Sequence, residues 1–160
     1  MSSIPLPNLA ATEALGRALG PLLFPGAVVA LVGGLGAGKT HFVRAVAEGL
    51  GVRNPAAVTS PTFVLIQEYP ARLPIYHFDA YRLNSVNEFV ALGTDEYFHA
   101  DGVCLVEWAD RVTDALPAER LTLTFRVVSE TEREVIAEAT GERYAELLSA
   151  WIGGGSPSVR

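Results

Sequence analysis

The chain reads AVVALVGGLGAGKT from Ala27 to Thr40, and this stretch decides the fold. Its first six residues are apolar and rich in β-branched side chains, a pattern typical of a strand buried on both faces. A glycine-rich loop follows from Gly33 to Gly38, and apolar residues recur at helical spacing from Lys39 to Leu50. The order of strand, glycine-rich loop and helix predicts an α/β domain.

The loop matches G-x-x-x-x-G-K-[ST] at every fixed position, in the strand-to-helix context that this motif requires. Glycines allow the backbone to surround a phosphate with N–H groups, and the helix N-terminus adds the positive end of its dipole. Lys39 is then expected between the β- and γ-phosphates, and the Thr40 hydroxyl is expected to ligate Mg²⁺. The motif therefore predicts a nucleoside triphosphate site.

Lys39 is the single lysine among 12 basic residues. No second lysine exists to form the Asn-Lys-x-Asp loop with which GTPases read guanine, so ATP is the favoured nucleotide. The lysine of a eukaryotic-type protein kinase lies on a strand of a different fold, and a Schiff-base lysine would have to be free of phosphate contacts. The lone lysine argues against both of these classes.

Two acidic residues follow apolar strands and are candidates for the carboxylate that an ATPase needs near Mg²⁺. Glu107 follows the more uniformly apolar run, 103–106, so we expect it nearer the centre of the sheet and favour it for the metal. Asp79 follows 75–78, and we expect it to orient water or to sense the γ-phosphate. Either residue could instead be an ordinary solvated acid at a strand end.

A hydroxyl-bearing segment, Thr59-Ser60-Pro61-Thr62, follows the helix of the phosphate loop. P-loop switches place such a segment near the γ-phosphate, although an ordinary proline turn explains it equally well. Trp108 is interpreted either as a core residue or as a side chain that closes over the site. His77 is interpreted as a strand residue, and no cluster of His and Cys suggests a metal site.

Further elements follow from hydrophobic periodicity and turn residues. We expect helices at 9–19, 86–92 and 142–152, a buried strand at 103–106, and hairpins formed by 63–69 with 75–78 and by 121–128 with 133–139. Asn8 and Gly20 are the expected ends of the first helix. The pattern predicts one domain, residues 1–152, with a mixed sheet flanked by helices, and a flexible tail at 153–160.

Composition narrows the class of protein. The chain has 160 residues and 49% hydrophobic content, enough for one core and unlike a disordered chain. Its net charge of −6 argues against a free-standing nucleic-acid binder. The single Cys104 excludes an intramolecular disulfide. Neither a secretory signal nor a membrane span is apparent, so we expect a cytoplasmic protein without membrane contact.

The runs GGLGAGKTHF, VTSPTFVLIQEY, YHFDAYRL, ALGTDEYF and VCLVEW, in this order, together resemble the bacterial TsaE (YjeE) family. These are small P-loop ATPases of tRNA threonylcarbamoyladenosine biosynthesis. The resemblance covers about residues 6–140. The glycine-rich loop alone is unspecific, whereas the joint presence of SPTF, HFDAYR and VEW is specific.

The resemblance implies a mixed-sheet P-loop fold that binds ATP and Mg²⁺ and hydrolyses ATP weakly when alone. It also implies TsaD and TsaB as partners, which transfer a threonylcarbamoyl group to adenosine 37 of tRNAs that decode ANN codons. The chain would reach tRNA only through these partners. The excess of acidic over basic residues agrees with indirect contact to tRNA, because a basic face would recruit RNA nonspecifically.

The resemblance also implies site residues. The residues expected to bind the nucleotide are Thr12, Gly33, Gly36, Ala37, Gly38, Lys39, Thr40, His41 and Arg133. Thr40 and Glu107 are expected to bind Mg²⁺, and Lys39, Asp79 and Glu107 are expected to take part in catalysis. A switch-like role is expected for Ser60, Thr62 and Trp108. In one departure, this chain has Gly34 where the family usually has an acidic residue, which puts a partner contact by that acid in doubt.

Two other functions remain open from the residues themselves. A small-molecule kinase with a P-loop would usually carry a mobile lid with arginines, but Arg82 is the only arginine between Arg72 and Arg111. A binding module without turnover would not need both Asp79 and Glu107.

Overall fold

A computed structural model describes residues 1–61 and 64–154. The strands are β1 (Ser2–Leu6), β2 (Val28–Val32), β3 (Ile66–Tyr69), β4 (Ile75–Asp79), β5 (Val103–Glu107), β6 (Arg120–Val127) and β7 (Arg133–Thr140). The α-helices are α1 (Leu9–Leu19), α2 (Lys39–Gly49), α3 (Val86–Ala91), α4 (Thr94–Phe98) and α5 (Glu142–Gly154). Short 3₁₀ turns occupy Gly20–Leu22, Pro55–Ala57, Ala109–Arg111 and Thr113–Ala115.

The strands form one mixed sheet in the order β1-β7-β6-β2-β5-β4-β3. β6, β2, β5 and β4 pair in parallel at its centre, whereas β1, β7 and β3 pair antiparallel toward its two edges. The predicted α/β fold with a mixed sheet is confirmed. Since parallel strands end at the same edge of a sheet, the carboxyl ends of β2, β5 and β4 lie together, which is where open α/β sheets bind ligands.

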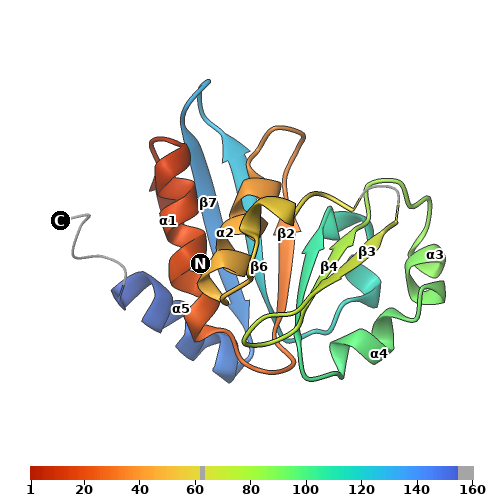
Figure 1. Cartoon of the computed structure of the whole chain (residues 1–160). Coiled ribbons are helices and arrows are strands. Elements are labelled where there is room, and N and C mark those ends of the chain that lie inside the picture. The colour runs from red at the N-terminus through yellow and green to blue at the C-terminus, as the bar shows by residue number, and fades with distance from the viewer. Residues whose placement is uncertain (62–63, 155–160) are drawn as a thin grey trace.

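Helices cover both faces of the sheet. In Figure 1, α1 and α5 lie beside the β7 end, and α3 and α4 lie beside the β3 end. Alternate residues of β2 enter two apolar clusters: Val29 and Leu31 pack with α1, α2 and α5, and Val28 and Ala30 pack with α3 and α4. Burial of β2 on both faces explains its continuous apolar sequence.

The first helix begins and ends where the sequence predicts. The Asn8 side chain accepts a hydrogen bond from the Ala11 N–H at 2.9 Å, which caps the helix N-terminus. Gly20 ends α1 but keeps a right-handed conformation with φ −46°, and the chain continues into a 3₁₀ turn. The predicted end of the first helix at Gly20 is therefore confirmed.

Other differences from the predicted elements concern short segments. β3 begins at Ile66, and Phe63, the predicted start of that strand, lies outside the described residues. β1 and α4 were not predicted, because each is only five residues long and shows too little periodicity.

The final helix continues two residues beyond its predicted end. α5 runs to Gly154, because burial of Leu148 and Trp151 holds the preceding turns in place despite the poor helix propensity of glycine. Residues 155–160, most of the predicted flexible tail, lie outside the described residues. In the two described ranges, 1–61 and 64–154, no helix has the length and apolar character needed to cross a membrane.

Two glycines allow α1 and α2 to pack closely. A Cβ added at Gly16 would lie 2.7 Å from the Ala45 Cβ and 2.8 Å from the Phe42 carbonyl oxygen. A Cβ added at Gly49 would lie 2.5 Å from the Arg17 carbonyl oxygen. The close packing fixes α2, and therefore the loop at its N-terminus, against α1.

We expect Gly16→Ala to destabilise the protein by about 1–3 kcal/mol, the usual cost of overpacking, even though alanine is the better helix former. Gly153→Ala is the matched control in α5, where an added Cβ meets nothing within 4 Å. Urea unfolding followed by circular dichroism measures both free energies. Equal stability of the two variants would contradict the close packing of α1 on α2.

Candidate functional site

The carboxyl edge of the central strands borders a cleft of about 300 Å³. Its walls come from the loop after β2, the start of α2, the segment before β3, and the ends of β4 and β5. The cleft is lined by Gly34, Leu35, Gly36, Ala37, Gly38, Lys39, Thr40, His41, Ser60, Asp79, Tyr81, Glu107 and Trp108. Most of the predicted site residues thus surround one cleft.

The loop from Gly33 to Gly38 has the backbone conformation that its glycines permit. Gly33, Gly36 and Gly38 have φ values of 148°, 74° and 101°, which side-chain-bearing residues rarely adopt. The Gly38 carbonyl accepts the Phe42 N–H at 3.0 Å, so α2 starts directly at the loop. The positive end of the α2 dipole therefore lies at the cleft, where an anionic phosphate would be stabilised.

Lys39 is almost fully buried at the centre of the site, with 5% exposure. Its ammonium donates to the carbonyls of Gly33 and Gly34 and lies 3.6 Å from the centre of the Trp108 ring. Desolvation by burial lowers the pKa of Lys39, and the negative charges of Glu107, Asp110 and Asp79 oppose that effect. A phosphate would add further negative charge beside this ammonium and stabilise its charged form.

Trp108 has a left-handed backbone with φ 58°, an uncommon conformation for a residue with a side chain. Its ring lies against Tyr81, with ring centres 4.8 Å apart, as well as against Lys39. Trp108 therefore belongs to the wall of the cleft rather than to the interior of the core.

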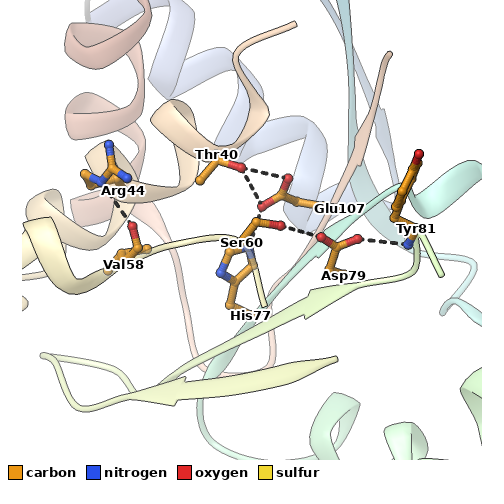
Figure 2. Close-up of polar contacts among 8 residues, drawn as sticks. All are labelled: Thr40, Arg44, Val58, Ser60, His77, Asp79, Tyr81 and Glu107. Atoms are coloured by element: carbon orange, nitrogen blue, oxygen red, sulfur yellow. Dashed lines mark hydrogen bonds and ion pairs between the residues drawn. The ribbon is translucent and has the colours of Figure 1, made fainter. Parts of the chain in front are cut away.

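Thr40 and Glu107 meet across the cleft, as Figure 2 shows. The Thr40 Oγ1 lies 3.2 Å and 3.3 Å from the two Glu107 carboxylate oxygens, and Glu107 is 2% exposed. A hydroxyl and a carboxylate are hard oxygen ligands of the kind that suit Mg²⁺. Within the described parts of the chain, no group of three or more His, Cys, Asp or Glu could hold a metal by itself. The pair fits a metal that is shared with nucleotide phosphates.

The structure adds a contact that the sequence interpretation missed. His77 is a strand residue, as expected, but its Nε2 lies 2.6 Å from Oε2 of Glu107. Strands β4 and β5 are parallel neighbours, and His77 and Asp79 point to the same face of β4 because side chains alternate along a strand. The spacing of His77 and Asp79 was the available signal, but the pairing of their strands was not known from sequence.

Asp79 lies beside Glu107, since the two residues are register partners at the ends of β4 and β5. Its carboxylate accepts the Ser60 hydroxyl and, at 2.8 Å, the Tyr81 N–H (Figure 2). The segment that carries Ser60 is also held by Arg44, whose Nε donates to the Val58 carbonyl at 3.1 Å. The predicted switch-like residue Ser60 thus contacts Asp79, whereas Thr62 lies outside the described residues.

Thr12 and Arg133 approach the phosphate loop from outside it. Thr12 is buried, and it lies next to Gly38. A Cβ added at Gly38 would be 3.9 Å from the Thr12 Cγ2. The Arg133 guanidinium donates to the Gly36 carbonyl at 3.2 Å and 3.0 Å. Both residues predicted near the nucleotide therefore lie at the loop. His41 lines the cleft and is exposed.

Gly34 offers space for the acidic residue usual at this position in the resembled family. A Cβ at Gly34 would meet nothing within 4 Å, and the Gly34 carbonyl accepts a hydrogen bond from Lys39 through the backbone. A side chain at this position would therefore meet no steric obstacle, and the contact with Lys39 does not depend on one.

Comparisons with known proteins agree with this geometry. The profile of the family described as "Threonylcarbamoyl adenosine biosynthesis protein TsaE" matches residues 6–135. The tRNA threonylcarbamoyladenosine biosynthesis protein TsaE of Bacillus subtilis (strain 168) is 46% identical over 137 residues, covering 85% of this chain and 84% of the relative. The protein of the same name from Treponema pallidum (strain Nichols) is 44% identical over 124 residues, covering 78% and 90%.

A solved structure shares the whole fold. The crystal structure of Bacillus subtilis YdiB superposes with a TM-score of 0.80 at 39% sequence identity, covering 96% of this chain and 95% of that one. The chain therefore belongs to the TsaE family and has its role in the biosynthesis of threonylcarbamoyladenosine in tRNA.

Proposed function

We propose that the protein binds ATP with Mg²⁺ in the cleft and hydrolyses it slowly when alone. The observation that supports this is the meeting of Thr40 and Glu107 directly beside Lys39, at the N-terminus of α2. ATP is the proposed nucleotide because the chain has no second lysine for a guanine-reading loop. Mg²⁺ would be held by Thr40 and Glu107 and would neutralise negative charge on the phosphates.

Each side chain then has a distinct part in the reaction. Lys39 and the N–H groups of the loop bind the β- and γ-phosphates, and Thr40 and Glu107 hold the metal. Asp79 is fixed by Ser60 and by the Tyr81 N–H, so its carboxylate is positioned to orient the attacking water. Thr12 and Arg133 support the nucleotide from the outer side of the loop.

We further propose that TsaB and TsaD are the partners of this protein and that it reaches tRNA only through them. We also propose that the protein and these partners act in the cytoplasm. With 12 basic and 18 acidic residues the chain has little positive charge with which to bind a phosphate backbone. Ser60 connects the wall of the cleft to Asp79, so ATP and ADP should present different surfaces to a partner. A difference in affinity between these two states is what makes hydrolysis useful in a cycle.

Lys39→Met should weaken ATP binding at least about 100-fold, because a charge-assisted hydrogen bond contributes about 1.5–3 kcal/mol and Lys39 makes more than one to the phosphates. Isothermal titration calorimetry measures the affinity, and circular dichroism checks the fold. Arg17→Met is the control, since Arg17 is an exposed α1 residue paired with Glu48. Unchanged affinity in folded Lys39→Met would contradict the phosphate assignment.

The two carboxylates should have separable effects. Glu107→Gln should weaken the Mg²⁺ dependence of ATP binding, whereas Asp79→Asn should leave binding within a few-fold and reduce turnover by about 10²–10⁴-fold, because general-base contributions act in the transition state. Asp110→Asn, an exposed acid near Lys39, is the control and should change neither. If Asp79→Asn lost the Mg²⁺ dependence and Glu107→Gln kept it, the two roles are reversed.

Association with TsaB and TsaD should depend on the nucleotide. We expect tighter association with a non-hydrolysable ATP analogue than with ADP or without nucleotide, measured by biolayer interferometry, and equal association in all three conditions for Lys39→Met. The isolated chain should bind tRNA weakly. Equal association of the wild type in all three conditions rules out the switch, and tight, salt-sensitive tRNA binding rules out indirect contact.

A further inference from the structure

We propose that His77 is a positioning residue for the carboxylate of Glu107. Its Nε2–H donates to Oε2 of Glu107 and holds the carboxylate beside Thr40, where the two side chains would share a metal. The inference rests on the proposed function, because it assigns to His77 a role toward the Mg²⁺–ATP complex.

Donor and acceptor can be assigned from the chemistry of the pair. Glu107 must be ionised to bind a divalent cation, and an ionised carboxylate only accepts hydrogen bonds. The hydrogen of the 2.6 Å contact therefore belongs to Nε2 of His77. The other contact of Glu107 comes from the Thr40 hydroxyl, so two donors on two different elements fix its plane. Hydrogen bonds of this kind orient metal-binding groups and tune their affinity.

The surroundings of His77 argue against a role as core filling. The side chain is 0% exposed, and the residues on the same face of β4 and β5 include apolar Ile75, Val103 and Leu105. A leucine would fill such a place without desolvating two ring nitrogens. The Nδ1 of His77 has no hydrogen-bond partner among the described residues, which makes the imidazole costly to bury. Within residues 1–61 and 64–154, the hydrogen bond with Glu107 is the polar contact that offsets this cost.

The hydrogen bond from His77 also keeps the Glu107 carboxylate from turning toward the Lys39 ammonium. Lys39 attracts Glu107 electrostatically from the phosphate loop. A carboxylate that was free to turn toward Lys39 would neutralise the ammonium that phosphates need and would leave Thr40 without its partner. Because His77 lies on β4, below Ser60 and Glu107 in Figure 2, its contact with Glu107 keeps the carboxylate on the side of Thr40.

The test compares His77→Leu, which removes the donor, with His77→Gln, whose side-chain amide places an N–H near the position of Nε2. Mn²⁺ serves as a spectroscopic substitute for Mg²⁺, and electron paramagnetic resonance measures its affinity for the complex of protein and a non-hydrolysable ATP analogue. We expect His77→Leu to weaken Mn²⁺ binding about 10–100-fold and His77→Gln to recover most of the loss. Affinity for a fluorescent ATP analogue in EDTA should stay unchanged in both variants.

Two further variants separate positioning from stability. Ile75→Val trims a buried residue on the same face of β4 without touching the Glu107 contact, and it should leave Mn²⁺ affinity unchanged. His77→Asn keeps a polar amide, but its side chain is one methylene too short to reach Glu107. Its Mn²⁺ affinity should therefore match that of His77→Leu. His77→Asn takes the place of His77→Leu if the leucine variant does not fold.

The possible outcomes are distinct. Equal Mn²⁺ affinity in wild type, His77→Asn and His77→Leu would overturn the proposal, as would a folded His77→Gln that binds Mn²⁺ no better than His77→Leu. Failure of the wild type to bind the ATP analogue in the presence of Mg²⁺ would instead contradict the proposed function itself.

Discussion

The contact between Thr40 and Glu107 is the interaction on which the site depends. It joins the first turn of α2 to the end of β5, two elements that are far apart in sequence. Parallel pairing of β2 with β5 makes it possible, because both strands then deliver their carboxyl ends to one edge. Parallel pairing of β4 with β5 in turn places Asp79 beside Glu107. The positions of the loop, the candidate metal ligands and the candidate water-orienting acid follow from the order of the strands β2, β5 and β4.

The sequence predicted the parts of the site that are carried by local patterns. The strand, loop and helix around Lys39, the Asn8 cap of α1, and strand-end acids at Asp79 and Glu107 all depend on residues near one another in the chain, and the structure places them as expected. The family resemblance is confirmed by the comparisons.

What the sequence could not predict depends on pairing between distant segments. The contact of His77 with Glu107 requires β4 to lie next to β5, and the hydrogen bonds from Arg133 to the Gly36 carbonyl require the β6–β7 hairpin to lie next to the loop. Short elements such as β1 and α4 have too few residues for a periodic signal, and they form because they pair with or pack on elements already in place.

The charges and hydrogen bonds of the cleft together indicate how a bound nucleotide would change the surface of the protein. Lys39 is a desolvated cation near three carboxylates, so a bound triphosphate would compete with those acids for it. Ser60 is attached to Asp79 by a hydrogen bond, and a typical hydrogen bond contributes only about 0.5–1.5 kcal/mol net. A γ-phosphate that accepted the Ser60 hydroxyl in place of Asp79 would therefore have only this modest hydrogen bond to replace. We therefore expect the wall of the cleft that carries Ser60 to be the part of the site that would respond most directly to the nucleotide bound.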